Sequence, residues 1–190
     1  MGLLQKYVSN LKDNNMPDTW VIGDTHFNHA KILTFKDYAG KPARVFDNVD
    51  AMNECMMDNW NSVVKPDDTV YHLGDVLFGI DKDKWLSKNF SRLNGKKNLI
   101  LGNHDNPKIL APYFKNIMLW EVIFPGLLLS HTPQHASTLA ETHRFGKQHM
   151  LNVHGHIHSN PSPAGPYRCV SVEQINYTPI NIEELMANLN

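Results

Sequence analysis

What the sequence lacks narrows the class of protein before any motif is considered. Cysteine occurs only twice, at Cys55 and Cys169, far apart and outside any CxxC pair. A thiolate metal site is therefore disfavoured, and nothing demands an oxidising compartment. No apolar run reaches the roughly 18 residues that cross a membrane, and the N-terminus has no long apolar segment of the export type. We therefore expect a cytoplasmic protein.

An excess of charge of one sign is also missing. The formal net charge is −1, which argues against a basic surface that coats nucleic acid, although local basic patches stay open. Internal repeats, low-complexity tracts and evident linkers are absent. With 190 residues, of which 42% are hydrophobic and 19% charged, the chain fits a single soluble domain, residues 1–190, with no room for a large cap domain.

Apolar patterning predicts strands and helices that alternate early in the chain, followed mostly by strands. Helices are predicted at residues 1–12, 48–64, 85–93, after Asn106-Pro107, and after Asn181, which forms a capping-box pattern with Glu184. Strands are predicted at residues 19–24, 68–75, 98–103, 150–154 and 168–172, with two more in 117–130 broken at Pro125-Gly126. Residues 27–46 are expected to be irregular, and residues 132–148 to form a polar loop. This order favours one mixed α/β domain.

Histidine is abundant, and its placement matters more than its number of 11. Five predicted strands end in small and metal-ligating residues: Gly23-Asp24-Thr25-His26, Gly74-Asp75, Gly102-Asn103-His104-Asp105, Ser130-His131 and Gly155-His156-Ile157-His158. Ligands bind at the carboxyl edge of α/β sheets, so we expect these side chains to converge. Turns favour Gly and Asp, but they do not explain a histidine or a paired acid each time.

The chemistry of this set indicates a pair of cations. Asp, Asn and His offer oxygen and nitrogen ligands without sulfur, which suits Mn²⁺, Fe or Zn²⁺ better than Ca²⁺. The candidates are too many for one ion, and only Asp24 and Asp75 are strand-end carboxylates that could bridge two. Two divalent cations with two carboxylates leave a positive centre that attracts phosphate. His104 is placed to protonate a leaving oxygen, with Asp105 expected to hold its ring.

The remaining histidines and basic residues have weaker cases. His72 and His154 are expected to be core or surface groups. Three histidines are expected to have no site role: His135, His143 and His149. The basic segments 28–45 and 132–149 leave the ligand-bearing edge, and either phosphate contacts or a solvated loop explain their charge. His29 and Arg44 are the candidates for substrate binding.

Taken in order, the strand-end blocks resemble the signature of a known family. Asp24-x-His26, Gly74-Asp75, Gly102-Asn103-His104-Asp105, His131 and Gly155-His156-x-His158 are similar to the motifs of calcineurin-like metallophosphoesterases, especially small single-domain bacterial and phage members. The resemblance spans Trp20 to His158. It implies a four-layer α/β/β/α sandwich, in which two mixed β-sheets are flanked by helices.

The resemblance also implies a dinuclear metal centre. One metal would be held by Asp24, His26 and His158, and the other by Asn103, His131 and His156, with Asp75 bridging. Manganese is the expected metal, with Fe, Zn, Ni or Co as alternatives. His104 would be the general acid, and Asp105 its partner.

The implied activity is hydrolysis of a phosphate ester by a metal-bridging hydroxide, with His104 assisting the leaving group. An open site without a cap favours a phosphodiester, such as a nucleotide or a nucleic-acid end. Two alternatives stay open: a phosphomonoesterase, and a metal-loaded module that binds a phosphorylated partner without turnover. No membrane partner is expected, and the sequence does not indicate an oligomeric state.

Overall fold

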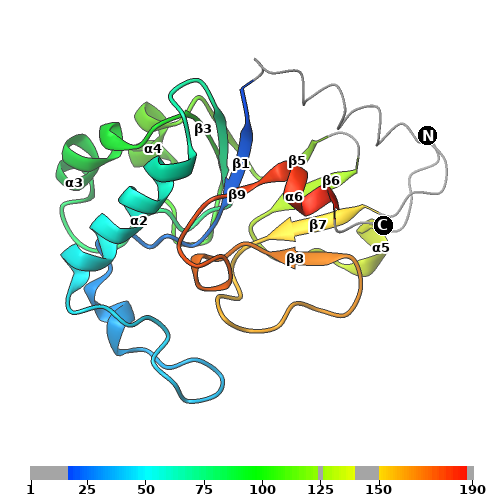
Figure 1. Ribbon diagram of the computed structural model, residues 1–190, viewed down its shortest axis with the longest axis horizontal. Coiled ribbons are helices and arrows are strands. Elements are labelled where there is room, and N and C mark those ends of the chain that lie inside the picture. Colours follow the sequence, from blue (N-terminus) through cyan, green and yellow to red (C-terminus); the bar gives the residue numbers. More distant parts are fainter. Residues whose placement is uncertain (1–16, 124–125, 140–149, 188–190) are drawn as a thin grey trace.

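Two β-sheets form the centre of the computed structural model, which describes residues 17–123, 126–139 and 150–187 (Figure 1). The first sheet has the order β4-β3-β2-β1-β9. Its strands are β1 (Thr19–Ile22), β2 (Thr69–His72), β3 (Lys96–Ile100), β4 (Asn116–Met118) and β9 (Ile180–Asn181). Strands β1 to β4 are parallel, whereas β9 runs antiparallel to β1. The parallel strands bring their carboxyl ends to one edge.

The second sheet has the order β5-β6-β7-β8. Its strands are β5 (Trp120–Ile123), β6 (Leu127–Ser130), β7 (Leu151–His154) and β8 (Tyr167–Cys169). Strands β6, β7 and β8 are parallel, and β5 is antiparallel to β6. Both sheets are therefore mixed, as the family resemblance implies.

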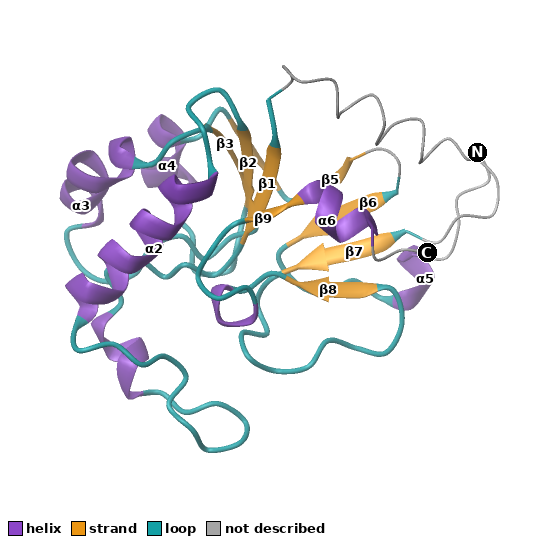
Figure 2. Ribbon diagram, in the orientation of Figure 1, coloured by secondary structure: helices purple, strands orange, loops and turns teal. Residues whose placement is uncertain are grey.

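Helices α2 (Val49–Val63), α3 (Lys82–Asn89) and α4 (Pro107–Leu110) cover the outer face of the first sheet (Figure 2). In α2, the Asn48 side chain accepts a hydrogen bond from Ala51 N, and Met52, Met56 and Trp60 form the buried stripe. Short 3₁₀ turns are η1 (Ala30–Thr34), η2 (Phe90–Arg92), η3 (Ala111–Tyr113) and η4 (Val172–Gln174). Among the described residues, none of the helices has the length and apolar character needed to cross a membrane.

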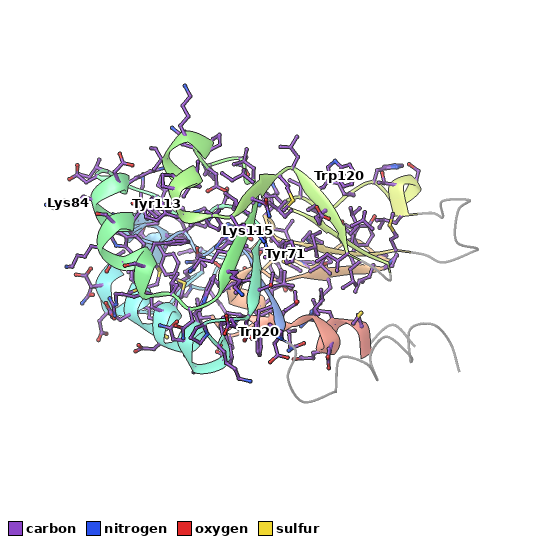
Figure 3. The ribbon with its side chains drawn as sticks, turned by 90° about the horizontal axis from the view of Figure 1, so that it is seen from above. Trp20, Tyr71, Lys84, Tyr113, Lys115 and Trp120 are labelled. Carbon is purple, nitrogen blue, oxygen red and sulfur yellow. The ribbon has the colours of Figure 1, made fainter. Side chains whose placement is uncertain are left out.

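The two remaining helices of the described chain lie next to the second sheet and the core between the sheets. Seen from above, Lys84 and Tyr113 lie on the helical side of the molecule, and Trp120 lies away from them on the second sheet (Figure 3). The segment that carries α5 (Ala136–Leu139) bonds to the second sheet, because Gln134 N donates to Asn152 Oδ1. Helix α6 (Ile182–Ala187) begins after Asn181, whose side chain accepts from Glu183 N.

Alternate residues of the first sheet supply two apolar cores. Ile22, Val70 and Leu99 face the helices, in a cluster with the apolar stripe of α2. Val21, Leu73 and Ile100 face the second sheet instead, where they pack with its buried leucines and valines. Both faces of the parallel strands are thus buried, which fixes their register and hence the position of every strand end.

The structure differs from the predicted elements mainly where elements are short. Residues 117–130 contain the end of β4 and all of β5 and β6, because the chain passes from the first sheet to the second at Leu119. Strand β9 was not predicted, since two residues show no period. The 3₁₀ turn η1 lies in the segment expected to be irregular, and α5 in the expected polar loop. The helix predicted at residues 1–12 lies outside the described residues.

Candidate metal centre

The loops that follow the parallel strands of both sheets meet at one edge of the molecule. Gly23, after β1, forms an isolated parallel bridge with Ser171, after β8. Gly23 N donates to Val170 O at 2.9 Å, and Val172 N donates to Gly23 O at 3.1 Å. These bonds join the carboxyl ends of the two sheets, so side chains from separate stretches of sequence converge there.

The first group of metal-ligating side chains consists of Asp24, His26 and His158, whose ligand atoms all lie within 4.8 Å of one another. The rings of His26 and His158 stack with centroids 5.2 Å apart. Neither ring nitrogen of the buried His26 has a hydrogen-bond partner among the described residues. Burial, followed by nearby cationic groups, strongly lowers its pKa. A neutral, buried and unpaired imidazole fits a metal ligand, because a bound ion would satisfy it.

A second group combines Asp24 with Asp75 and His131, again within 4.8 Å. His131 Nδ1 donates to the Leu73 carbonyl oxygen at 2.7 Å, which leaves Nε2 as the electron-pair donor. Asn103 Oδ1 lies 2.8 Å from that Nε2. The two groups therefore bring oxygen and nitrogen donors together without a thiolate, a donor set that suits Mn²⁺, Fe or Zn²⁺.

His156 and Asp75 connect the two groups. His156 Nδ1 lies 3.1 Å from Asn103 Oδ1 and 3.2 Å from His131 Nε2. Asp75 Oδ2 lies 3.5 Å from His26 Nε2 and 3.6 Å from His131 Nε2. A single carboxylate oxygen thus stands between a histidine of each group, and the seven side chains that the sequence pointed to come together.

The backbone at these residues is held in an uncommon conformation. Five of the seven have positive φ angles: Asp24 (55°), His26 (45°), Asp75 (55°), His156 (69°) and His158 (51°). Such a conformation costs a non-glycine residue of the order of 1–3 kcal/mol and persists only where the surroundings enforce it. Here both carboxylate oxygens of Asp24 share the backbone N–H of His156, and His26 N donates to Asp75 O. The strain is concentrated at the site, as expected where a functional geometry is enforced.

Asp24 is fully buried at the centre of this network. Its carboxylate accepts from Ser171 Oγ at 2.8 Å as well as from His156 N. Burial nevertheless raises the pKa of Asp24 to about 6, against the lowering effect of His158, His131 and these hydrogen bonds. A divalent cation beside the carboxylate would favour its ionised form, so the residue fits a metal ligand.

Asp105 has a different place from the one predicted, in which it holds the ring of His104. Its Oδ2 accepts from Asp75 N and Gly102 N, and its Oδ1 accepts from Val76 N, each at 2.9 Å. Within the described part of the chain, no hydrogen bond joins Asp105 to His104. Both oxygens are occupied by the backbone of the ligand loops, so Asp105 fixes the position of Asp75 rather than the orientation of His104.

Arg44, which was predicted to bind substrate, is also positioned differently from that prediction. Its side chain is buried, with 1% exposure. The guanidinium donates to the carbonyl oxygens of Asp24 and Thr25 and, through Nε, to Glu173 at 2.8 Å. Arg44 therefore lies behind the metal ligands and ties their loop to the chain, because its polar groups are directed at protein acceptors rather than at the cavity.

Glu173, in η4, was missed by the sequence analysis. His158 Nδ1 donates to Glu173 Oε1 at 3.0 Å, which leaves Nε2 for a ligand. Burial lowers the pKa of His158, but the hydrogen bond and the charge of Glu173 outweigh burial, so the net shift is upward. Glu173 follows a short strand without any neighbouring histidine, so the sequence carried no signal that it supports the site.

His104 and His29 border the same cavity. The ring centroid of exposed His104 lies 5.9 Å from that of His26, and His104 N donates to Asp75 Oδ1 at 2.9 Å. The His29 ring lies 5.6 Å from that of His26 and stacks on Phe78 at 4.2 Å. Both histidines line a cavity of about 460 Å³ beside the first ligand group.

Of the histidines expected to have no site role, two are buried, one is exposed, and two lie outside the described residues. His72 is buried against Trp60, with Nε2 2.9 Å from Thr25 Oγ1, and burial lowers its pKa to about 3. His154 is the buried last residue of strand β7, with Nδ1 2.9 Å from Gly155 O. His135 is exposed and contacts Ser137. His143 and His149 lie outside the described residues.

Close packing of the ligand loops gives a first prediction, at Gly102. Unless the loop moved, a Cβ there would collide with Asp75 Oδ1 and Asp75 N and would lie 3.0 Å from Asp75 Cγ. We therefore expect Gly102→Ala to destabilise the protein by about 1–3 kcal/mol, as overpacking does, and to weaken metal binding. Gly23→Ala is the matched control, since its Cβ would meet Leu73 Cβ at an ordinary 3.4 Å. Thermal unfolding with and without Mn²⁺ checks this, and equal melting temperatures for the two variants would contradict it.

The fold and the two ligand groups define the class: a mixed α/β protein with Asp, Asn and His donors at the carboxyl edge of paired sheets. Residues 18–188 match the model of the calcineurin-like phosphoesterase family. The chain belongs to this family, which confirms the resemblance found in the sequence.

Similar proteins include small archaeal and phage proteins. The chain is 33% identical over 176 residues to the uncharacterized protein MJ1445 of Methanocaldococcus jannaschii, covering 89% of each chain. It is 29% identical over 177 residues to the gene 66 protein of Mycobacterium phage L5, covering 76% of this chain and 79% of that protein. The crystal structure of AQ665 from Aquifex aeolicus, a protein of unknown function, superposes with a TM-score of 0.68 at 27% identity, covering 91% of this chain and 100% of that one. The fold is thus shared along nearly the whole chain.

Proposed function

We propose that the protein is a dinuclear metal-dependent phosphodiesterase that acts, as a single domain, on a nucleotide or a nucleic-acid end. The observation that carries the proposal is the pair of ligand groups that share Asp24, with Asp75 between His26 and His131. One ion would be held by Asp24, His26 and His158 and the other by Asn103, His131 and His156, with Asp75 bridging them.

Mn²⁺ is the proposed metal, with Fe, Zn, Ni or Co as alternatives, because the donors are imidazole, carboxylate and amide groups. When bound, two divalent cations neutralise the charge of phosphate oxygens and make water nucleophilic at neutral pH. The chain's own residues prepare this chemistry. The Leu73 carbonyl oxygen accepts a hydrogen bond from His131 Nδ1, and the Glu173 carboxylate accepts one from His158 Nδ1. Each of these bonds leaves the Nε2 atom of the ring free to face the site.

His104 is the proposed general acid. Its ring is exposed, lies next to His26 and lines the cavity, so a ring nitrogen can donate its proton to the leaving oxygen of an ester bound there. The hydrogen bond from His104 N to Asp75 Oδ1 fixes the backbone of this residue relative to the ligands. His29 borders the same cavity and is proposed as a substrate contact.

The cavity of about 460 Å³ has room for an organic group beside a phosphate group, which fits a nucleotide or a nucleic-acid end. Both cysteines are free, which fits a reducing compartment, so we propose a cytoplasmic location.

A direct test is hydrolysis of bis(p-nitrophenyl) phosphate after addition of Mn²⁺, beside p-nitrophenyl phosphate. We expect turnover of the diester to exceed that of the monoester, and a chelator to abolish it, because the charge that stabilises the transition state is supplied by the ions. Faster turnover of the monoester would favour a phosphomonoesterase. Tight binding of inorganic phosphate by the Mn²⁺-loaded protein, with no turnover of either ester, would favour the non-catalytic binding module.

A further inference from the structure

An aromatic wall distinguishes the cavity beside the ligands from a site that holds only phosphate. Its lining includes His26, His104 and His158. It also includes Phe35 and Tyr38, whose exposed fractions are 44% and 73%. Large aromatic surfaces left open to solvent at the mouth of a cavity are costly unless a ligand covers them. The wall therefore indicates a ligand with an apolar, planar part.

The segment that carries this wall is a β-hairpin, residues 35–43, which projects from the body of the molecule beyond η1 (Figure 1). Ala43 N donates to Phe35 O at 2.8 Å, and Asp37 N donates to Lys41 O at 2.7 Å. The Asp37 side chain accepts from Ala39 N and Lys41 N and so closes the turn. These bonds fix the positions of the two aromatic residues on the hairpin.

The hairpin is also fixed relative to the metal ligands. Directly after it, Arg44 is buried and donates to Asp24 O and to Glu173, which itself holds His158. At its start, Phe35 packs edge-on against His29, with centroids 5.8 Å apart. The wall therefore stands at a set distance from the phosphate position, as required if one ligand spans both.

Two lysines complete the chemistry of the cavity. Lys31 and Lys36 line it, and neither forms an ion pair in the part of the chain that the structure describes. Asp37 also lines the cavity, and its Oδ1 accepts hydrogen bonds from Ala39 N and Lys41 N, so the two lysines outnumber one carboxylate that is held at the turn of the hairpin. Free cations beside aromatic rings match a ligand that is both anionic and aromatic, because base stacking and phosphate charge are recognised together in this way.

We propose that the aromatic wall of the 35–43 hairpin stacks on the base of a nucleoside phosphate whose phosphate group lies at the metal centre. Phe35 and Tyr38 are then specificity-determining residues, and Lys31 and Lys36 attract the phosphate charge. The proposal rests on the function proposed above, since it names the substrate class of the same site. The same chemistry is presented by a free nucleotide and by the end of a single-stranded nucleic acid.

Equilibrium binding tests this without requiring turnover. Adenosine 5′-monophosphate and ribose 5-phosphate differ only by the base, and their affinities for the Mn²⁺-loaded protein can be measured by calorimetry. We expect the nucleotide to bind roughly 10-fold or more tightly, as stacking on aromatic side chains provides. The double variant Phe35→Ala/Tyr38→Ala should bring the two affinities together, and Phe35→Trp should keep them apart.

Two controls separate stacking from other effects. Trp120→Ala removes an aromatic residue with 62% exposure on edge strand β5, outside the cavity, and should leave the affinity ratio unchanged. Lys31→Gln/Lys36→Gln should weaken both ligands alike, with the ratio unchanged. Equal affinities in the wild type, or a ratio that survives the double alanine variant, would overturn the proposal. A hydrolysis assay with no turnover would overturn the proposed function alone.

A short 5′-phosphorylated single-stranded oligonucleotide distinguishes the two sources of the ligand. Binding tighter than that of the mononucleotide would assign the cavity to a nucleic-acid end, and equal binding would assign it to a free nucleotide. In both cases the affinity must fall in Phe35→Ala/Tyr38→Ala. An oligonucleotide affinity that does not depend on these residues would contradict stacking on the wall.

Discussion

Replacing His104 by alanine is expected to lower kcat by roughly 10²–10⁴-fold, the range for losing a general acid, on a diester whose leaving group is a nucleoside. The loss should be much smaller when the leaving group is p-nitrophenolate, because a phenolate departs without being protonated. The metal content should stay that of the wild type, since the contact of His104 with Asp75 is made by its backbone N and not by its ring.

Steady-state kinetics on both leaving groups, together with metal analysis, checks this prediction. His135→Ala is the matched control, because His135 is exposed and contacts only Ser137 among the side-chain partners described. An equal loss with both leaving groups would remove the proton-donor role from His104. A loss of metal would instead make His104 part of the ligand set.

Replacing Asp75 by alanine should reduce the bound Mn²⁺ from two ions to fewer than one per chain and abolish hydrolysis. Its Oδ2 stands 3.5 Å from His26 Nε2 and 3.6 Å from His131 Nε2, so its loss affects both ligand groups. In the wild-type protein each bound ion should add about 2.7 kcal/mol of stability at an Mn²⁺ concentration 100 times its Kd. That gain corresponds to a rise of roughly 5–10 °C in melting temperature for a protein of this size, and the variant should show little of it.

Asp75→Asn separates charge from shape in this experiment. The amide keeps an oxygen that can accept from His104 N, but it lacks the negative charge that lies between the two groups. It should lose metal as Asp75→Ala does, with a metal-free melting temperature close to that of the metal-free wild type. Asp67→Ala, at an exposed acid paired with Lys96, is the control. Two ions bound to Asp75→Ala would refute the bridging role.

The sequence predicted most of the ligand-bearing framework because its local signals are strong. Short apolar runs around Val70 and Leu99 predicted the central strands, and burial of both faces of these strands fixes their register and hence where each one ends. Helix α2 was also predicted from a local signal, since its apolar residues recur at helical spacing; the structure adds that the Asn48 side chain caps it. Short elements such as β9 give no periodic signal, and they depend on the strand they pair with.

The roles of Asp105 and Arg44 show the limit of reasoning from neighbouring residues. Asp105 follows His104 in the chain, which suggested that the pair acts together. Its carboxylate instead bonds to backbone groups that include Asp75 N, 30 residues away. Arg44 lies in a basic segment, which suggested a surface role, but it pairs with Glu173 at a separation of 129 residues. Neither partner is visible without the tertiary structure.

By itself, the sequence determined which side chains are candidates to hold cations, and that these oxygen and nitrogen donors follow strand ends. These properties are local, because side-chain type and strand periodicity are written in short stretches. Only the tertiary structure decided which residues hydrogen-bond to the candidate ligands and orient them, and where the aromatic hairpin stands relative to those ligands. Those features depend on contacts between distant segments, whose geometry is set by the packing of two sheets.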